Sequence, residues 1–290
     1  MDERDWLILK LLYEKKNITK TAQSLYISQP SLTKRLQQIE KEFKVTIVQR
    51  GTKGVHFTPQ GEYLAKCAED MLRRLRQIKE RALNMEQEVS GTLRLGVSNY
   101  ITQHKLPRLL KLFREQYPKV EFSVTTGWSK DIFTLAYHQD VHIGMVRGDY
   151  QWSDAKKLLF QENICITSRE KIELHELPCL PRIDYQTDIL LKSMIDNWWS
   201  GTFSQPPLIG MEVDKADTCK EMVVNGLGYG ILPSVLVEKN KELYRINLEN
   251  EAGDPLVRNT WMFYHESDLQ MNLVKAFVEF VEGIDFIHDL

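Results

Sequence analysis

Hydroxyl, amide and cationic side chains gather along one expected helix near the N-terminus. Ser28 is a good N-cap, and Pro30 lies in the first turn, where a missing N–H is tolerated. The helix then runs to about Phe43, with an apolar stripe at spacings of four, three and four residues. Its polar faces can bond base edges and phosphates of DNA, although any one such residue is more often simply solvated. The expected DNA-contacting set is Ser28, Gln29, Pro30, Ser31, Thr33, Lys34 and Arg35, with Arg50 and Lys53 from a following hairpin.

A second group of polar residues lies where expected strands end in the C-terminal part of the chain. Hydroxyls come directly before a helix at 98–100 and at 125–129, which suits an anion held by backbone N–H groups. Arg147 ends one strand and Arg258 begins another, and arginine pairs bidentately with carboxylates. Ordinary helix capping by Ser129 and surface salt bridges of the two arginines remain open alternatives. The candidate anion-binding residues are Ser98, Tyr100, Thr126, Ser129, Arg147 and Arg258.

The sequence offers little support for redox, enzymatic or metal chemistry. The cysteines Cys67, Cys165, Cys179 and Cys219 form no CxxC pair, so reduced thiols are expected, although a Cys179–Cys219 redox pair stays conceivable. There is no P-loop, GxSxG or HExxH motif, and the glycines at 226–230 lack GxGxxG spacing. We therefore expect no enzyme, no catalytic residues, no metal site and no cofactor.

The N-terminal polar set requires a small module to position it. Residues 3–15 predict a helix, a second helix begins at Asn17 or Thr19, and the helix from Ser28 follows after a short turn. Two β-prone runs, 45–48 and 55–58, flank a Gly-rich turn and predict a hairpin. This order is typical of a winged helix-turn-helix, which we place at 1–58.

A long helix is expected next, from Pro59 to about Glu88, in a linker segment 59–90 that ends in a hinge. Its apolar residues alternate at spacings of four and three over more than three heptads, which is typical of a coiled-coil seam. The seam predicts pairing with a second copy of the chain, and packing on its own domain is the alternative. The seam residues are Leu64, Ala68, Met71, Leu75, Ile78, Ala82, Met85 and Val89.

Residues 91–290 alternate strands and helices and predict an α/β, doubly wound arrangement of parallel strands, as one large domain or two small lobes. The expected strands are 92–97, 120–126, 141–146, 208–213 and 257–264, and the expected helices are 101–117, 129–138, 215–225 and 268–282.

Charge separates the two ends of the chain. The 290 residues carry a formal charge of −2, but residues 1–90 carry +5 and residues 91–290 carry −7. Such asymmetry is typical of a nucleic-acid-binding end joined to a different module. No apolar run is long enough to span a membrane, and the charged N-terminus lacks a signal peptide's apolar core. We expect a cytoplasmic protein that binds double-stranded DNA and no membrane.

Residues 17–61 resemble the LysR-type transcriptional regulators. The stretch 21–33 (TAQSLYISQPSLT) matches the family's helix-turn-helix, and Arg50 and Gly61 fall at its wing and linker start. The departures are small: Thr21-Ala22 replaces Ala-Ala, Ile47-Val48 replaces Leu-Phe, and Lys44 replaces a glycine. The likeness continues to GLGYGILP at 226–233. It implies a homotetramer with paired linker helices and a two-lobed, periplasmic-binding-protein-like effector domain, with lobe I at about 91–163 and 267–290 and lobe II at about 164–266.

Within that family the chain is most similar to the citrate-responsive catabolite-control regulators of Gram-positive bacteria. TGWS at 126–129, VHIGMVRG at 141–148, DTCK at 217–220 and RNTW at 258–261 carry this likeness. It implies that Ser98, Ser129, Arg147 and Arg258 hold a tricarboxylate, although the same scaffold can serve another anionic effector in another pathway. A solute-binding protein and an enzyme are disfavoured alternatives. On this view Arg35→Ala weakens operator binding without disturbing the fold, and Arg147→Ala abolishes stabilisation by the ligand.

Overall fold

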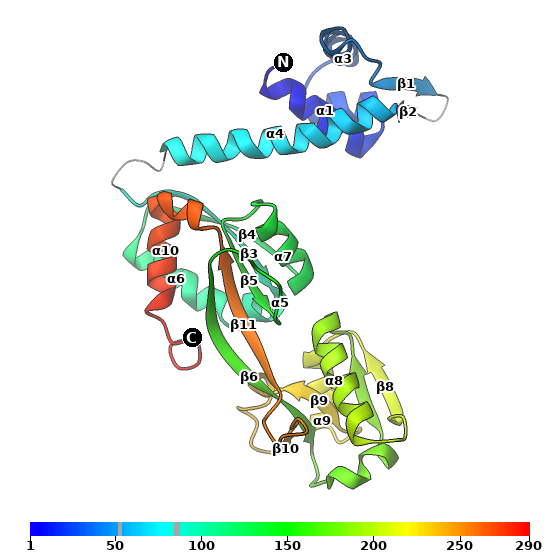
Figure 1. The fold of residues 1–290 in the computed structure, drawn as a ribbon, viewed down its shortest axis with the longest axis vertical. Helices are drawn as coiled ribbons and strands as arrows, with labels where there is room; N and C mark the ends of the chain where they lie inside the picture. The colour runs from blue at the N-terminus through cyan, green and yellow to red at the C-terminus, as the bar shows by residue number, and fades with distance from the viewer. Residues whose placement is uncertain (52–53, 84–87) are drawn as a thin grey trace. The chain divides into compact units, whose positions relative to one another are not determined.

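A computed structural model describes residues 1–51, 54–83 and 88–290, without the side chains of Arg50 and Leu83. The chain forms two compact units, Met1–Met85 and Glu86–Leu290 (Figure 1). The first unit therefore includes both the module predicted at 1–58 and the long helix of the predicted linker segment. The reason is packing, because the long helix buries Leu64 and Ala68 in the core of that module.

The first unit contains helices α1 (Glu3–Lys15), α2 (Ile18–Ser24) and α3 (Gln29–Phe43), the hairpin strands β1 (Val48–Gly51) and β2 (Gly54–Phe57), and helix α4 (Pro59–Leu83). The caps are local, as predicted. The Asn17 side chain accepts from the Lys20 N–H at 2.9 Å and begins α2, and Ser28 begins α3. A winged helix-turn-helix is thus confirmed. The long helix is described as far as Leu83, whereas Glu88, its predicted end, is not helical, and residues 84–87 lie outside the described residues.

Gly61 fixes the start of α4 against the wing. A Cβ at this position would lie 2.1 Å from the carbonyl oxygen of Ile47, so only glycine permits the approach. The Thr58 hydroxyl donates to the Thr46 carbonyl at 2.6 Å and accepts from the Gly61 N–H at 3.0 Å. These contacts tie hairpin and helix together.

The second unit is built on a mixed sheet of strand order β10-β6-β11-β5-β3-β4, with β9 also paired to β6. Its strands are β3 (Gly91–Ser98), β4 (Val120–Gly127), β5 (Ile143–Arg147), β6 (Lys156–Ser168), β9 (Gly230–Pro233), β10 (Tyr244–Asn247) and β11 (Val257–Tyr264). A separate parallel pair joins β7 (Arg182–Tyr185) and β8 (Ile209–Val213).

The helices of this unit are α5 (Asn99–His104), α6 (Leu106–Gln116), α7 (Ser129–Tyr137), α8 (Ile189–Thr202), α9 (Ala216–Val224) and α10 (Asn272–Glu282), with short 3-10 turns η1 (Leu174–Cys179), η2 (Ser234–Leu236) and η3 (Glu266–Gln270). The helix predicted at 101–117 is two helices broken at Lys105. Pro107 explains the break, because proline lacks the N–H that would continue the helix ladder.

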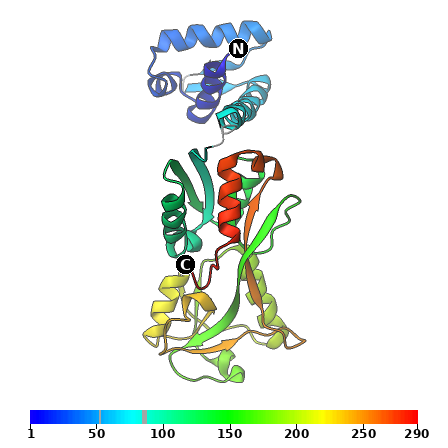
Figure 2. The same cartoon turned by 90° about the vertical axis from the view of Figure 1, so that its left-hand side faces the viewer.

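The all-parallel expectation is wrong for β11. Strands β3, β4 and β5 are parallel, whereas β11 is antiparallel to both β5 and β6. Strand β6 leaves the first lobe for the second and β11 returns, so these neighbours must run in opposite directions (Figures 1 and 2). Residues 260–264 of β11 pair with β5, so this part of the strand belongs to the sheet of lobe I, although we expected it in lobe II.

Helices α6 and α10 cover one face of the lobe I sheet around Phe113 and Phe277, and α7 covers the other (Figure 1). Glycine allows α7 to lie close, because a Cβ on Gly144 would meet Ala136 Cβ at 2.9 Å. This packing fixes the beginning of α7 at the carboxyl ends of β3 and β5.

Candidate functional site

The start of α3 presents the expected DNA-contacting residues to solvent. Ser28, Gln29, Pro30, Ser31 and Lys34 are exposed, while Thr33 is half-buried. The Ser28 hydroxyl caps the helix by accepting the Ser31 N–H at 3.3 Å, and lies 2.8 Å from the Ser31 hydroxyl. The first turn of α3 therefore exposes polar side chains to solvent, while the apolar stripe of the helix faces the interior. A helix that enters a groove of DNA requires this arrangement.

Arg35 is held by α1. Its Nε and Nη2 donate to the two carboxylate oxygens of Asp5 at 2.5 and 2.7 Å, and Nη2 also reaches Asp2 at 3.2 Å. Asp5 is 1% exposed. Burial alone raises the pKa of the Asp5 carboxyl, but hydrogen bonds from Arg35 and the backbone N–H at Asp2 hold that pKa below its usual value. The expectation that Arg35→Ala leaves the fold undisturbed is therefore corrected, because that substitution strands a buried carboxylate.

The hairpin carries two of the expected contacts. Arg50 lies in β1, opposite Val55, and Lys53 falls outside the described residues. Tyr26, which sequence reasoning did not single out, is 96% exposed in the turn before α3 and has a left-handed φ of 53°. A bulky residue in that region is uncommon, and the φ angle cannot be read from residue types.

The second candidate site is a cavity of about 570 Å³ between the two lobes of the second unit. All six predicted anion-binding residues line it: Ser98, Tyr100, Thr126, Ser129, Arg147 and Arg258. Lobe II contributes a second group that sequence reasoning missed, namely Tyr185, Gln186, Thr187, Asp188, Asp214, Lys215 and Asp217. The missed residues lie at the end of β7, on the loops before α8 and α9, and in the first turn of α9. Asp217 belongs to the segment DTCK, which supported the family resemblance but was not assigned to the site.

Helix N-termini surround this cavity. The first residues of α5, α7 and α9 line it, as does Asp188, the N-cap of α8. Within the range 88–290, α8 has a side-chain cap at its N-terminus, whereas α5, α7 and α9 have none. The Ser129 hydroxyl instead accepts the backbone N–H of Arg147 at 3.1 Å. Uncapped N–H groups and the partial positive charge of helix N-termini favour an anion here.

Both arginines are already paired with carboxylates of the chain. The Nε of Arg147 donates to Glu162 Oε1 at 2.9 Å, Nη2 bonds the same oxygen, and the guanidinium stacks 4.2 Å from the centroid of the Tyr100 ring. Arg258 bonds Asp188 through Nη2. The arginines therefore form buried ion pairs rather than the surface salt bridges considered above, and neither is an unneutralised cation.

Several buried polar atoms around this cluster are unsatisfied. Among the side chains that the structure describes, Ser98 Oγ, Glu162 Oε2, Arg258 Nε and Tyr185 Oη have no hydrogen-bond partner. Burial raises the pKa of Tyr185 and of Tyr100, so both phenols remain protonated donors at neutral pH. Buried polar groups are rarely left unsatisfied, which marks this region as a place where a ligand or a rearrangement completes the bonding.

The structure also describes the cysteines and the side chains that could bind a metal ion. The four cysteines are free thiols, Cys179 is exposed, and burial raises the pKa of the Cys219 thiol to about 12. Nowhere in the described part of the chain do three His, Cys, Asp or Glu side chains gather as they would around a metal ion. Among residues 1–51, 54–83 and 88–290, no helix has the length and apolar character needed to cross a membrane.

Comparison with known proteins matches both units to one family. The family model "Bacterial regulatory helix-turn-helix protein, lysR family" matches residues 4–62, and "LysR substrate binding domain" matches residues 86–284. The chain belongs to the LysR family of transcriptional regulators. It is a DNA-binding regulator with an effector-binding domain, and its relatives are regulators rather than enzymes.

Relatives and solved structures of this LysR family cover nearly the whole chain. YraN of Bacillus subtilis (strain 168), described as an uncharacterized HTH-type transcriptional regulator, is 44% identical over 98% of each chain. YkuM of the same organism, described in the same words, is 34% identical over 96% of this chain and 95% of its own. The crystal structure of full-length CbnR complexed with target DNA has a TM-score of 0.67 and 19% identity over 97% of this chain and 99% of its own, which shows a shared fold.

Proposed function

We propose that this LysR-type regulator senses a small carboxylate in the cavity between its lobes. The observation that carries the proposal is the convergence of helix N-termini, three of them without a side-chain cap, on a cavity that also holds two buried arginines. The six residues Ser98, Tyr100, Thr126, Ser129, Arg147 and Arg258 are the proposed effector-binding set. Citrate, which the sequence resemblance implied, is the most highly charged candidate.

Closure of the two lobes around a bound ligand would couple ligand binding to regulation. Strands β6 and β11 are the two connections between the lobes, and Glu162 and Arg258 lie opposite each other on them. A ligand that contacts both sides of the cavity favours the closed arrangement, and a shift between two arrangements is the usual basis of such a switch. The proposed response is a change in how an assembly spaces its DNA-binding modules.

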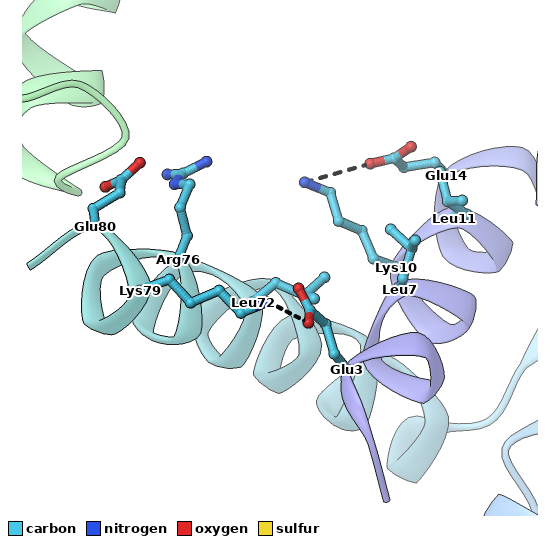
Figure 3. A pocket seen from close by; sticks show the side chains of 9 residues that line it. All are labelled: Glu3, Leu7, Lys10, Leu11, Glu14, Leu72, Arg76, Lys79 and Glu80. Carbon is cyan, nitrogen blue, oxygen red and sulfur yellow. Dashed lines mark hydrogen bonds and ion pairs between the residues drawn. The ribbon is translucent and has the colours of Figure 1, made fainter. Parts of the chain in front are cut away.

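Self-association is proposed through α4. On this helix Leu64 and Ala68 are buried by the helix's own module, whereas Met71 and Ile78 are 44% and 64% exposed. The exposed half of the seam thus remains available for contact with a second copy of the chain. Beside it, α1 and α4 enclose a cavity of about 530 Å³ with Leu7, Leu11 and Leu72 in its wall and a rim that includes the Lys79–Glu3 ion pair (Figure 3). We infer a dimer through these helices and a homotetramer of two such dimers.

The proposed partner of α3 and the wing is double-stranded operator DNA, and we propose that the protein acts in the cytoplasm. Affinity that depends on phosphate contacts falls steeply with salt. Gel shifts with operator DNA between about 50 and 200 mM salt test this part, and an affinity that does not change with salt contradicts it.

The effector proposal is tested by thermal unfolding of the full chain with acetate, succinate and citrate. A ligand that binds only the native state raises its unfolding temperature, and the rise grows with ligand concentration. Arg258→Gln should remove the rise for any acid that gives one. If none of the three acids shifts the unfolding temperature, the carboxylate proposal fails while the assignment to the family stands.

A further inference from the structure

We propose that Asp188 is an internal counter-ion of Arg258, and that the effector's carboxylate displaces it on binding. This inference rests on the proposed carboxylate site and names the residue that competes with the ligand there. On this view the chain holds its own anion in the position that the effector takes, and the difference between the two states is which carboxylate pairs with Arg258.

The two buried ion pairs of the cavity are not equivalent. Glu162 lies behind Arg147, its side chain is 0% exposed, and it does not line the cavity. Asp188 does line the cavity, directly beside Arg258. A ligand that enters the cavity can therefore reach the Arg258–Asp188 pair, whereas the Arg147–Glu162 pair is backed by protein.

Arg258 also makes fewer bonds than its guanidinium allows. Within the described range 88–290, its Nη2 bonds Asp188, while its Nε is buried without a partner. Arginine can present two parallel N–H groups to one carboxylate, which is stronger than a single bond. A carboxylate arriving from the cavity can satisfy the orphaned Nε as well as Nη2, which Asp188 does not do.

The cationic charge of Arg258 requires some anion at all times. Burial and the nearby Arg147 lower the pKa of Arg258 to about 10, so the guanidinium stays charged at neutral pH. A buried charge without a partner is strongly unfavourable. Asp188 can leave only when another anion replaces it, which makes the exchange selective for acids.

Asp188 has a place to go when it is displaced. Its Oδ1 accepts the Leu191 N–H at 3.1 Å and so caps α8, while Oδ2 faces Arg258. Rotation of the carboxylate can keep the cap and turn the second oxygen toward the cavity. The exchange therefore does not unravel α8.

The exchange of Asp188 for the effector's carboxylate determines which ligand charge the cavity prefers. The cavity wall carries three cations, Arg147, Lys215 and Arg258, against three acids, Asp188, Asp214 and Asp217. Arg147 stays paired with Glu162, so displacing Asp188 adds Arg258 to Lys215 and makes two cations, not three, available to a ligand. We therefore infer a preference for an acid with one carboxylate, or two, over a tricarboxylate.

The test measures carboxylate affinity of the full-length protein by titration calorimetry, with acetate, succinate and citrate as probes. Asp188→Asn removes the counter-ion and keeps a good N-cap for α8. It should bind the preferred acid about tenfold more tightly than wild type, because the ligand no longer competes for a charged hydrogen bond. Asp214→Asn is the matched control, since it removes the same charge from the same cavity wall. Its affinity should change by less than about threefold.

A gain confined to Asp188→Asn supports the proposal, as does its disappearance in Asp188→Asn/Arg258→Gln. Equal gains in both single variants, or no gain in Asp188→Asn while wild type binds, overturns the counter-ion role and leaves the carboxylate site standing. If neither wild type nor Asp188→Asn binds any of the acids, both proposals fail. Should Asp188→Asn not fold, as judged by circular dichroism, Asp188→Ser keeps a capping side chain and takes its place.

Discussion

The Arg147–Glu162 pair gives a quantitative test of how this cavity is held together. Arg147→Gln removes the partner of a carboxylate whose side chain is 0% exposed and whose Oε2 already has no partner among the described side chains. Breaking a buried pair by removing one member destabilises a protein by about 3–5 kcal/mol. The pair is barely screened by solvent, because the Arg147 side chain is only 8% exposed. We expect about 4 kcal/mol of destabilisation for Arg147→Gln.

The double variant Arg147→Gln/Glu162→Gln is the control, because it removes both charges at once. Replacing a whole buried pair is often close to neutral, so we expect it to recover most of the loss, to within about 1 kcal/mol of wild type. The assay is urea unfolding followed by tryptophan fluorescence, since five of the six tryptophans lie in the second unit. At a urea dependence of about 3 kcal/mol per molar, the single variant's midpoint falls by about 1.3 M.

The reasoning is refuted if Arg147→Gln unfolds within about 0.3 M urea of wild type, or if the double variant is no more stable than the single one. The result also governs how ligand binding is measured. A loss of ligand response in Arg147→Ala can arise from a damaged cavity, and Arg258→Gln and Asp188→Asn also break a buried ion pair, so the ligand response of each variant is compared with its own urea unfolding curve.

Three further predictions concern the first unit. Arg35→Ala should lower the unfolding temperature of this unit in calorimetry. Lys34→Ala should leave the unfolding temperature unchanged and should reduce the salt slope of operator binding by about one. The opposite pattern contradicts the contact between Arg35 and Asp5. The pKa of Asp5 is lowered on folding, so its stabilisation is present above the unfolded value of about 3.9 and is lost as pH falls through the folded value. The stability gap between wild type and Asp5→Asn should therefore close below about pH 4, and a gap that widens there would exclude this account. Ile78→Glu should reduce the oligomeric state in sedimentation because it charges the exposed half of the α4 seam, and Ile189→Glu in α8, at a residue exposed to a similar extent, should not.

Features with local causes could be predicted from the sequence. The caps at Asn17 and Ser28 depend on residues three positions apart, and the stripe of α3 depends on helical spacing, so the winged helix-turn-helix followed directly. The cavity lining was predicted for one lobe, because strand ends before helices are visible as hydroxyl-rich segments. The lining from the other lobe was not, since residues 185–188, 214 and 215 carry no distinguishing pattern and the segment 217–220 supported only the family resemblance.

The direction of β11 and the partners of the arginines could not be predicted, because both depend on contacts between distant segments. Arg35 pairs with Asp5 across 30 residues, and Arg258 pairs with Asp188 across 70. An arginine counts as an available cation only if no acidic side chain of the same protein pairs with it. The spacing of residues in the sequence does not show whether such a pair forms. The same limit applies to the net charges of +5 and −7, which count Arg35 and Arg258 without their partners.

Glu162 and Asp188 change how much positive charge the two arginines of the cavity offer to a ligand. Two arginines beside uncapped helices favour a highly charged acid only if their charges are available. With Glu162 fixed behind Arg147, and with Asp188 reachable from the cavity, the charge that a ligand can use is decided at position 188. A chain that kept both arginines and replaced Asp188 by a neutral capping residue would offer its effector one more positive charge. Two regulators with the same arginines can therefore differ in the acid they detect, and exchanging this single side chain is the direct way to measure that difference.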